Sequence, residues 1–137
     1  MQGTTLKGRA IVKGLCRAEA LVSTRSISFL GGVDPADGKI IEKNNELCGR
    51  CIKDKILCFP HGSGSTVGSY VLFSLAKKNL APKAMVNQTA DPVVVVGAII
   101  ADITMVDQVD IRQIRSGDLL EVDGTRGTVK ILERRGS

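Results

Sequence analysis

The chain has 137 residues, 43% of them hydrophobic and 24% charged, a balance typical of one globular domain that buries its core without metals or disulfides. Its formal net charge of +5 favours an anionic partner, but one Tyr, three Phe and no Trp offer little for stacking on nucleic-acid bases. The longest apolar run, PVVVVGAII, is too short to cross a bilayer, and the N-terminus shows no secretory signal. We therefore expect a soluble cytoplasmic protein with reduced cysteines, bound to neither membrane nor nucleic acid.

The first half of the chain reads as strands and a structured loop. Residues 6–14 and 18–24 alternate apolar and polar positions, which is typical of half-buried strands. Residues 28–41, SFLGGVDPADGKII, concentrate turn-forming residues and predict a structured loop. The run KILCF at 55–59 is β-branched and aromatic enough for a buried strand, which Pro60 ends because proline removes a ladder donor.

The second half combines helical and extended patterns. Residues 69–80 show helical spacing with lysines in the last turn, so a helix is predicted that ends before Pro82. AMVNQ at 84–88 is a candidate strand, and residues 91–106 are apolar on all sides, as buried parallel strands and the helices covering them tend to be. Residues 116–133 read as a hairpin. The chain is thus predicted to be one mixed α/β domain over 1–137.

A glycine-serine loop, HGSGSTVGS from residue 61, separates the predicted buried strand from the predicted helix. Open α/β sheets bind ligands at this position, and unpaired helix N–H groups attract anions there. Gly62 and Gly64 allow tight turns and close approach of the backbone, whereas Ser63, Ser65 and Thr66 present hydroxyls. The loop lacks the lysine of a Walker loop and the third glycine of a dinucleotide-binding loop. The alternative is a connection whose hydroxyl only caps the helix.

The other side chains that suggest chemistry are the histidine, the cysteines and four of the arginines. His61, the only histidine, is a candidate general base or phosphorylated carrier. Cys48, Cys51, Cys58 and His61 have a spacing that suggests a zinc site, but Cys58 lies in an apolar strand pattern from which neighbouring thiols cannot converge on one metal. Buried cysteines acting as small apolar residues are the favoured interpretation. Arginines at four positions are candidate anion clamps: Arg9, Arg17, Arg25 and Arg50.

Four segments in this order resemble the small swivel-domain subunit of the aconitase X family: ISFLGGVDPADGKII, ELCGRCIKDKILCFPHGSGSTVGSYVLFSLAKKNLAPKAMV, VGAIIADI and IRSGDLLEVDGTRGTV. The resemblance spans Gly8 to Val129 and is greatest to the stand-alone archaeal form. It implies a swivelling β/β/α domain, with mixed β-structure and flanking helices, that docks over a large subunit carrying a 4Fe-4S cluster. The cluster ligands belong to the large subunit, and the cysteines of this chain do not match them, so no metal is expected in this chain.

The resemblance also implies a reaction and its residues. The reaction is dehydration of (R)-5-phosphomevalonate to trans-anhydromevalonate 5-phosphate in a modified mevalonate route to isoprenoids. The open iron of the cluster acts as a Lewis acid on the leaving hydroxyl, and Ser65 matches the serine that takes a proton from the carbon next to a carboxylate. The neighbouring loop positions, Ser63, Gly64 and Thr66, are the expected substrate-binding residues.

A serine hydroxyl removes a C–H proton only if its alkoxide is stabilised by helix N–H groups and a nearby cation. Aconitases place an arginine two residues after the matching serine, whereas this chain has Val67 there, and Ser63 replaces another arginine often seen in the family's loop. The stabilising cation is therefore expected from Arg50, as a candidate anion clamp, or from the large subunit.

Three alternatives stay open at this point. The subunit could serve a dehydratase for another hydroxy acid, such as a hydroxyproline, because substrate specificity depends on contacts from both chains. Swivelling β/β/α domains also occur with a phosphohistidine, for which His61 is the candidate. A non-catalytic anion-binding domain is favoured only by the basic charge of the chain.

Overall fold

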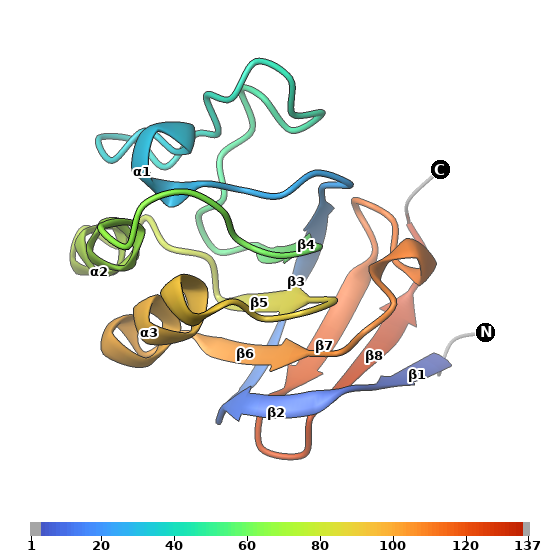
Figure 1. Cartoon of the computed structure of the whole chain (residues 1–137). Coiled ribbons are helices and arrows are strands. Elements are labelled where there is room, and N and C mark those ends of the chain that lie inside the picture. The colour runs from blue at the N-terminus through green and yellow to red at the C-terminus, as the bar shows by residue number, and fades with distance from the viewer. Residues whose placement is uncertain (1–3, 136–137) are drawn as a thin grey trace.

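The computed structural model describes residues 4–135, so the ends of the domain predicted over 1–137 lie outside the described residues. Within that range a single mixed sheet carries two ten-residue helices on one side (Figure 1). The elements in chain order are β1 (Thr4–Lys7), β2 (Arg9–Val12), β3 (Leu15–Val22), α1 (Phe29–Gly32), β4 (Ile56–Phe59), α2 (Gly68–Lys77), β5 (Ala84–Asn87), α3 (Pro92–Ala101), β6 (Thr104–Asp107), the 3-10 turn η1 (Ile111–Gln113), β7 (Leu119–Asp123) and β8 (Thr128–Glu133).

The sheet has eight strands in the order β1-β8-β7-β3-β4-β5-β6-β2. The strands β3, β4, β5 and β6 pair in parallel, and all other pairs are antiparallel. The two ends of this order, β1 and β2, are separated in sequence by Gly8 alone. The sheet therefore curls until one short segment, along the bottom of the view in Figure 1, pairs with both of its halves. The predicted mixed α/β class is confirmed.

The strand β4 lies between two apolar clusters, and all four of its residues are buried. Leu57 and Phe59 belong to the cluster beneath α2 and α3, whereas Ile56 and Cys58 belong to the cluster formed with the antiparallel strands. Successive side chains of a strand point to opposite faces, so a strand covered on both sides must be apolar throughout. This explains why KILCF shows no polar alternation, as the buried-strand prediction assumed.

The predicted segments of the second half correspond to elements of the structure. The predicted helix is α2, which ends at Lys77, ahead of Pro82. The candidate strand at 84–88 is β5, and the hairpin is β7 and β8, joined by residues 124–127. No helix among residues 4–135 is long and apolar enough to cross a membrane.

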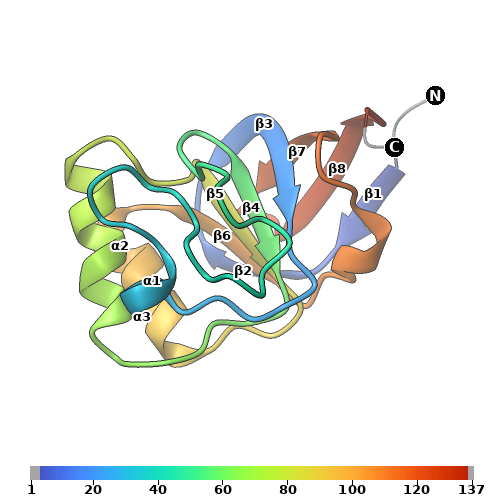
Figure 2. The same ribbon diagram turned by 90° about the horizontal axis from the view of Figure 1, so that it is seen from above.

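The apolar segment 91–106 forms α3 followed by β6, and although the segment is apolar on all sides, the helix is buried on one side only. The side of α3 that faces the sheet and α2 is buried through Val94, Gly97 and Ala98. Its other side is exposed to solvent, because α3 lies on the outside of the sheet and nothing in the described chain covers it (Figure 2). The exposed side chains are Val96, Ile99 and Ile100.

The bend between β1 and β2 requires glycine at position 8. A Cβ atom on Gly8 would lie 2.2 Å from the carbonyl oxygen of Asp107 and 2.7 Å from a methyl group of Val109. The Gly8 N–H also donates to the carbonyl of Gly127 at 2.8 Å, which joins the bend to the hairpin. Any side chain here would push the bend away from both halves of the sheet.

We predict that Gly8→Ala lowers the free energy of unfolding by about 1–3 kcal/mol, because the added methyl group collides with backbone. Gly68→Ala is the matched control: the nearest atom to its Cβ would be a Val93 methyl carbon at 3.4 Å, an ordinary contact, and α2 accepts alanine. Urea unfolding of both variants measures the difference. Equal midpoints for Gly8→Ala and the unmodified chain would contradict the steric requirement.

Candidate active-site loop

The glycine-serine loop occupies residues 60–67, between the end of β4 and the start of α2, at the carboxyl ends of the parallel strands. Its first part pairs with the segment that follows β3. Ile27 N–H donates to the carbonyl of His61 at 3.3 Å, and Ser63 N–H donates to the carbonyl of Ile27 at 3.0 Å. The loop is therefore fixed by a short parallel bridge, and the position predicted for it is confirmed.

Asp91 ties the loop to the start of α3. One carboxylate oxygen accepts the N–H of Gly62 at 3.0 Å, and the other accepts the N–H of Val93 at 3.2 Å as the N-cap of α3. The Ser69 hydroxyl donates to the carbonyl of Val93 at 2.6 Å, so the starts of α2 and α3 are joined as well. The loop and both helix starts form one hydrogen-bonded unit.

Two glycines allow this close packing. Gly64 has φ of +87°, a conformation that residues with a side chain rarely adopt, and a Cβ atom on it would lie 2.3 Å from the Ser28 hydroxyl oxygen. Gly62 lacks a positive φ, but its Cβ would lie 2.3 Å from a methyl group of Val94 and 2.5 Å from Asp91. The first glycine is required by backbone conformation and the second by lack of space.

Ser65 is exposed and lies at the positive end of α2. Its hydroxyl oxygen accepts the N–H of Val67 at 3.1 Å, and its carbonyl accepts the N–H of Gly68 at 2.9 Å. The N-cap of α2 is Val67 and has no side-chain cap bond, so the contact from Val67 caps the turn just ahead of the helix, and it would also stabilise negative charge on the same oxygen. The geometry thus serves both the capping and the proton-accepting interpretations of Ser65.

The other predicted site residues of the loop are exposed beside Ser65. Ser63, Gly64 and Thr66 have solvent-accessible positions, and Ser63 is held through its backbone N–H rather than its hydroxyl. His61 is exposed too, and its Nδ1 lies 2.7 Å from the carbonyl oxygen of Gly62. The loop thus presents three hydroxyls and an imidazole to solvent.

The structure does not bring Arg50 to this loop. Arg50 helps to lower the pKa of Glu19, a shift caused mainly by the hydrogen bond and charge of Lys55. Lys55 immediately precedes β4, whereas Ser65 follows the opposite end of that strand. Within residues 4–135, no Lys or Arg side chain donates a hydrogen bond to residues 60–67. The candidate clamp therefore lies apart from the serine it was expected to assist.

The cysteines do not form a metal site in the described chain. Groups of three or more His, Cys, Asp or Glu able to hold a metal are absent from residues 4–135. Cys58 is buried in β4, where burial raises the pKa of its thiol, whereas Cys48 is exposed and Cys51 lies beside the carbonyl of Asp37. All four cysteines are free thiols. The residues present do not fit an iron-sulfur cluster or the zinc site that the spacing suggested.

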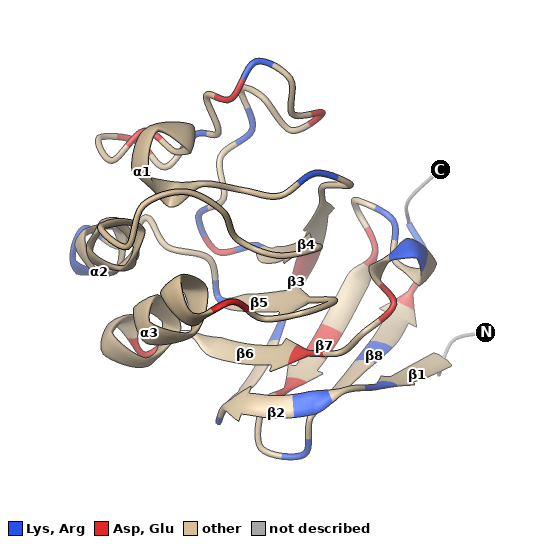
Figure 3. Cartoon of the chain, viewed as in Figure 1, with Lys and Arg blue, Asp and Glu red and all other residues tan. Residues whose placement is uncertain are grey.

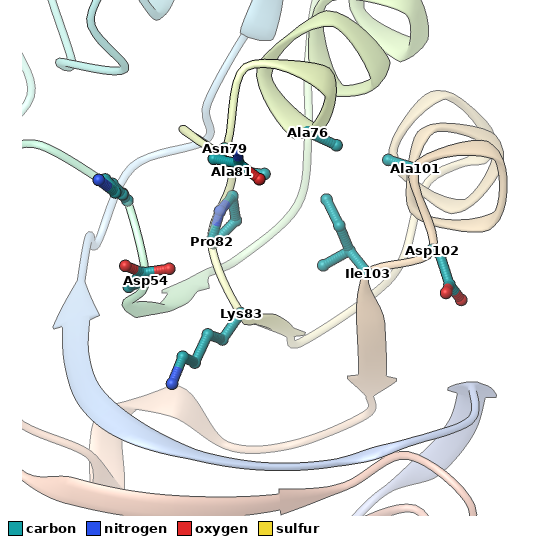
Figure 4. A pocket seen from close by; sticks show the side chains of 10 residues that line it. Asp54, Ala76, Asn79, Ala81, Pro82, Lys83, Ala101, Asp102 and Ile103 are labelled. Atoms are coloured by element: carbon teal, nitrogen blue, oxygen red, sulfur yellow. The ribbon is translucent and has the colours of Figure 1, made fainter.

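A separate pocket lies at the far ends of the two helices (Figure 4). It has a volume of about 280 Å³, and its polar side chains include Asn79 and Asp102. Both residues have positive φ and donate backbone N–H groups to the last turns of α2 and α3. Their polarity is thus explained by helix termination, because Asn and Asp tolerate the left-handed conformation. This pocket is at the end of α2 opposite to Ser65.

Glu46 holds the long loop before β4 against the carboxyl end of β3. Its side chain accepts hydrogen bonds from the N–H and hydroxyl of Thr24 at 2.8 and 2.7 Å and from the Ser23 hydroxyl at 2.9 Å. Burial alone would raise the pKa of Glu46, but these hydrogen bonds outweigh it and lower that pKa. The segment from Thr24 leads directly to Ile27, which pairs with the glycine-serine loop.

Comparisons with known proteins identify the family of this chain. The sequence profile of the aconitase X swivel domain matches residues 5–131. The chain belongs to the aconitase X swivel-domain family. The phosphomevalonate dehydratase small subunit of Thermococcus sibiricus is 53% identical over 128 residues, which cover 93% of this chain and 98% of that protein. The protein of the same name from Pyrococcus furiosus is 51% identical and covers 93% of this chain and 95% of its own length.

Solved structures support the family assignment. The crystal structure of aconitase X from Thermococcus kodakaraensis, in its holo form, has a TM-score of 0.94 at 49% identity and covers 96% of this chain and 100% of its own. A 3-isopropylmalate dehydratase from Methanocaldococcus jannaschii has a TM-score of 0.58 at 15% identity, over 90% of this chain and 84% of its own. This second likeness concerns the fold alone. The predicted family resemblance is therefore confirmed.

Sequence reasoning did not identify Asp91 or Ser28 as part of the site. Asp91 carried a usable signal, because aspartate followed by Pro92 and an apolar run is the pattern of a helix N-cap. Its second bond, to the loop, depends on a contact 29 residues away in sequence. Ser28 gave no signal in the sequence, because it matters through the space it fills next to Gly64.

We predict that Asp91→Ala loosens the loop, because the N–H groups of Gly62 and Val93 both lose their acceptor. The expected loss of stability is about 1–2 kcal/mol, typical of a removed N-cap. Hydrogen exchange at Gly62 and Val93 should accelerate, with little change in β8. Asp110→Ala, which removes the cap of η1, is the control and should leave exchange at Gly62 unchanged. Protected Gly62 in Asp91→Ala would contradict the role of Asp91.

We predict that Glu46 makes the free energy of unfolding depend on pH. A carboxylate whose pKa is lowered by folding stabilises the protein above its unfolded pKa of about 4.3, and this contribution is lost as pH falls through the lower, folded value. Glu46→Gln should therefore reduce stability at pH 7 and flatten the decline in stability below about pH 4.3. Urea midpoints measured from pH 7 to pH 3 give both results. Parallel curves for the variant and the unmodified chain would exclude this contribution.

Proposed function

We propose that this chain is the small subunit of a two-chain hydro-lyase that converts (R)-5-phosphomevalonate to trans-anhydromevalonate 5-phosphate in a modified mevalonate route to isoprenoids. The observation that carries the proposal is the Ser65 hydroxyl, exposed at the start of α2 with the Val67 N–H directed at its oxygen. Relatives named as the small subunit of phosphomevalonate dehydratase cover over nine-tenths of the chain, in support of this substrate.

In this proposal Ser65 removes the proton from the carbon between the carboxylate and the hydroxyl-bearing carbon. The electron pair of that C–H bond becomes the new double bond, and the hydroxyl leaves the adjacent carbon, so the products are the unsaturated acid and water. The alkoxide of Ser65 is stabilised by the N–H of Val67 and by the positive end of α2. These are the contributions that this chain makes from its own residues.

The remaining groups are assigned to the large subunit. A base of this strength needs a cation as well as N–H donors, and the described chain directs no Lys or Arg hydrogen bond to residues 60–67. The cysteines do not gather, so the 4Fe-4S cluster is assigned to the large subunit. The small subunit alone is then inactive, and we place the assembled enzyme in the cytoplasm.

Substrate choice within the hydroxy acids depends on that assembly. Ser63, Gly64 and Thr66 are proposed to contact substrate from this side, but they carry no charge to pair with a phosphate. The phosphate is then bound by helix N–H groups or by the large subunit. Assays of the assembled enzyme with phosphomevalonate and with hydroxyproline separate the proposed substrate from the alternative.

We predict that Ser65→Ala, assembled anaerobically with the large subunit, lowers kcat by about 10²–10⁴-fold, the usual contribution of a positioned proton acceptor. Phosphomevalonate dehydration at saturating substrate is the measurement. Ser74→Ala, at a half-buried position within α2, should leave turnover unchanged. Full turnover by Ser65→Ala would overturn the assignment of the base.

A second variant separates proton transfer from helix capping. Asparagine is a good N-cap because its side-chain oxygen accepts a backbone N–H, but its amide has no hydroxyl to act as a base. Ser65→Asn should therefore regain the stability lost in Ser65→Ala while its kcat stays low. Recovery of both stability and turnover would mean that Ser65 acts as a cap only.

A further inference from the structure

An apolar helix surface on the outside of the molecule calls for an explanation. Helix α3, PVVVVGAIIA, has no charged or polar side chain, and a helix that is apolar all round is normally buried. Nevertheless 58% of Ile99 and 48% of Val96 are exposed. Charged residues stand only at the two caps of α3, Asp91 and Asp102. Figure 3 shows where Lys, Arg, Asp and Glu lie along the ribbon around this helix.

The neighbouring helix extends this surface. Tyr70 of α2 is 69% exposed, although the chain has only one tyrosine and three phenylalanines. The two helices lie side by side (Figures 1 and 2). They pack so closely that a Cβ atom on Gly97 would lie 2.5 Å from a methyl group of Leu72. We call the exposed apolar side chains of this pair the α2–α3 face: Val67, Tyr70, Phe73, Val96, Ile99 and Ile100.

The α2–α3 face is continuous with the active-site loop. A groove of about 190 Å³ between the helix starts is lined by Thr66, Ser69, Pro92, Val93 and Val96. Thr66 directly follows Ser65, and Val67 is both part of the face and the donor to the Ser65 hydroxyl. A partner protein that brings substrate to Ser65 must therefore come close to the edge of this face.

We propose that the α2–α3 face is the surface on which the large subunit docks, an inference that rests on the proposed two-chain enzyme. The loop needs a cation that residues 4–135 do not direct to it, and a partner that supplies it must sit beside Thr66 and Val67. Exposed aromatic and aliphatic side chains are the composition of an interface core, and a charge beside them is that of Lys77, whose Nζ lies 5.5 Å from the centre of the Phe73 ring. A second copy of the chain on the same face would obstruct the groove beside Ser65 without supplying the missing groups.

The test is association of the full-length small chain with the large subunit, measured by analytical ultracentrifugation without substrate. Ile99→Glu and Tyr70→Glu change exposed positions and should fold normally, as circular dichroism and thermal unfolding would show. Each is expected to weaken association about tenfold or more, because a charge is buried in an apolar contact. Leu15→Glu is the control, since Leu15 is 65% exposed on β3, outside the face, and should leave association unchanged.

Measuring association and turnover separately distinguishes failure of the docking inference from failure of the proposed function. If the large subunit binds but phosphomevalonate is not dehydrated, the proposed substrate fails while the docking result remains readable. If the face is correct, excess large subunit should restore kcat in Ile99→Glu but not in Ser65→Ala. Unchanged association in both glutamate variants would overturn the inference. It would also be overturned if the unmodified small chain associates with itself, and the glutamate variants lose this self-association but still bind the large subunit.

Discussion

The burial of β4 on both of its faces is the constraint on which the rest of the structure depends. Leu57 and Phe59 anchor the helical side, and Ile56 and Cys58 anchor the antiparallel side, so this strand contributes to both clusters, as β3, β5 and β6 also do. The glycine-serine loop leaves the carboxyl end of this strand. Ser65 is thus positioned by a fully buried strand, although the residue itself is exposed.

In the proposed function the small chain prepares one half of a reaction. Asp91 fixes the loop and caps α3, and Val67 directs its N–H to the hydroxyl of Ser65. These contacts organise dipoles before substrate arrives, which is how protein groups lower the free energy of a developing anion. The proposed base also needs a full charge, which would come from outside residues 60–67, so in this proposal the chemistry and the assembly of the enzyme are linked.

Much of this was predictable from local patterns. The buried strand KILCF, the helix ending before Pro82 and the loop between them follow from apolar content, helix spacing and glycine, and the structure confirms all three. The exposure of α3 was not predictable, because an apolar run is the same whether a core or a partner covers it. Arg50 was a candidate because a guanidinium group binds anions, but its position could not be predicted from the sequence. The fold brings it near Glu19, at the other end of β4 from Ser65.

The bend at Gly8 also bears on how the chain folds. Residues 4–12 pair with β6 at one end of the sheet and with β8 at the other, so both pairings join segments that lie far apart in sequence. Contacts so distant in sequence slow folding and leave strand edges unpaired in the meantime. Parallel pairing from β3 to β6 joins strands that are closer in sequence, and it can form before β1 pairs with β8. Residues 4–12 thus close the sheet by linking its two halves, and a chain lacking β8 would leave the edge of β7 unpaired and prone to association.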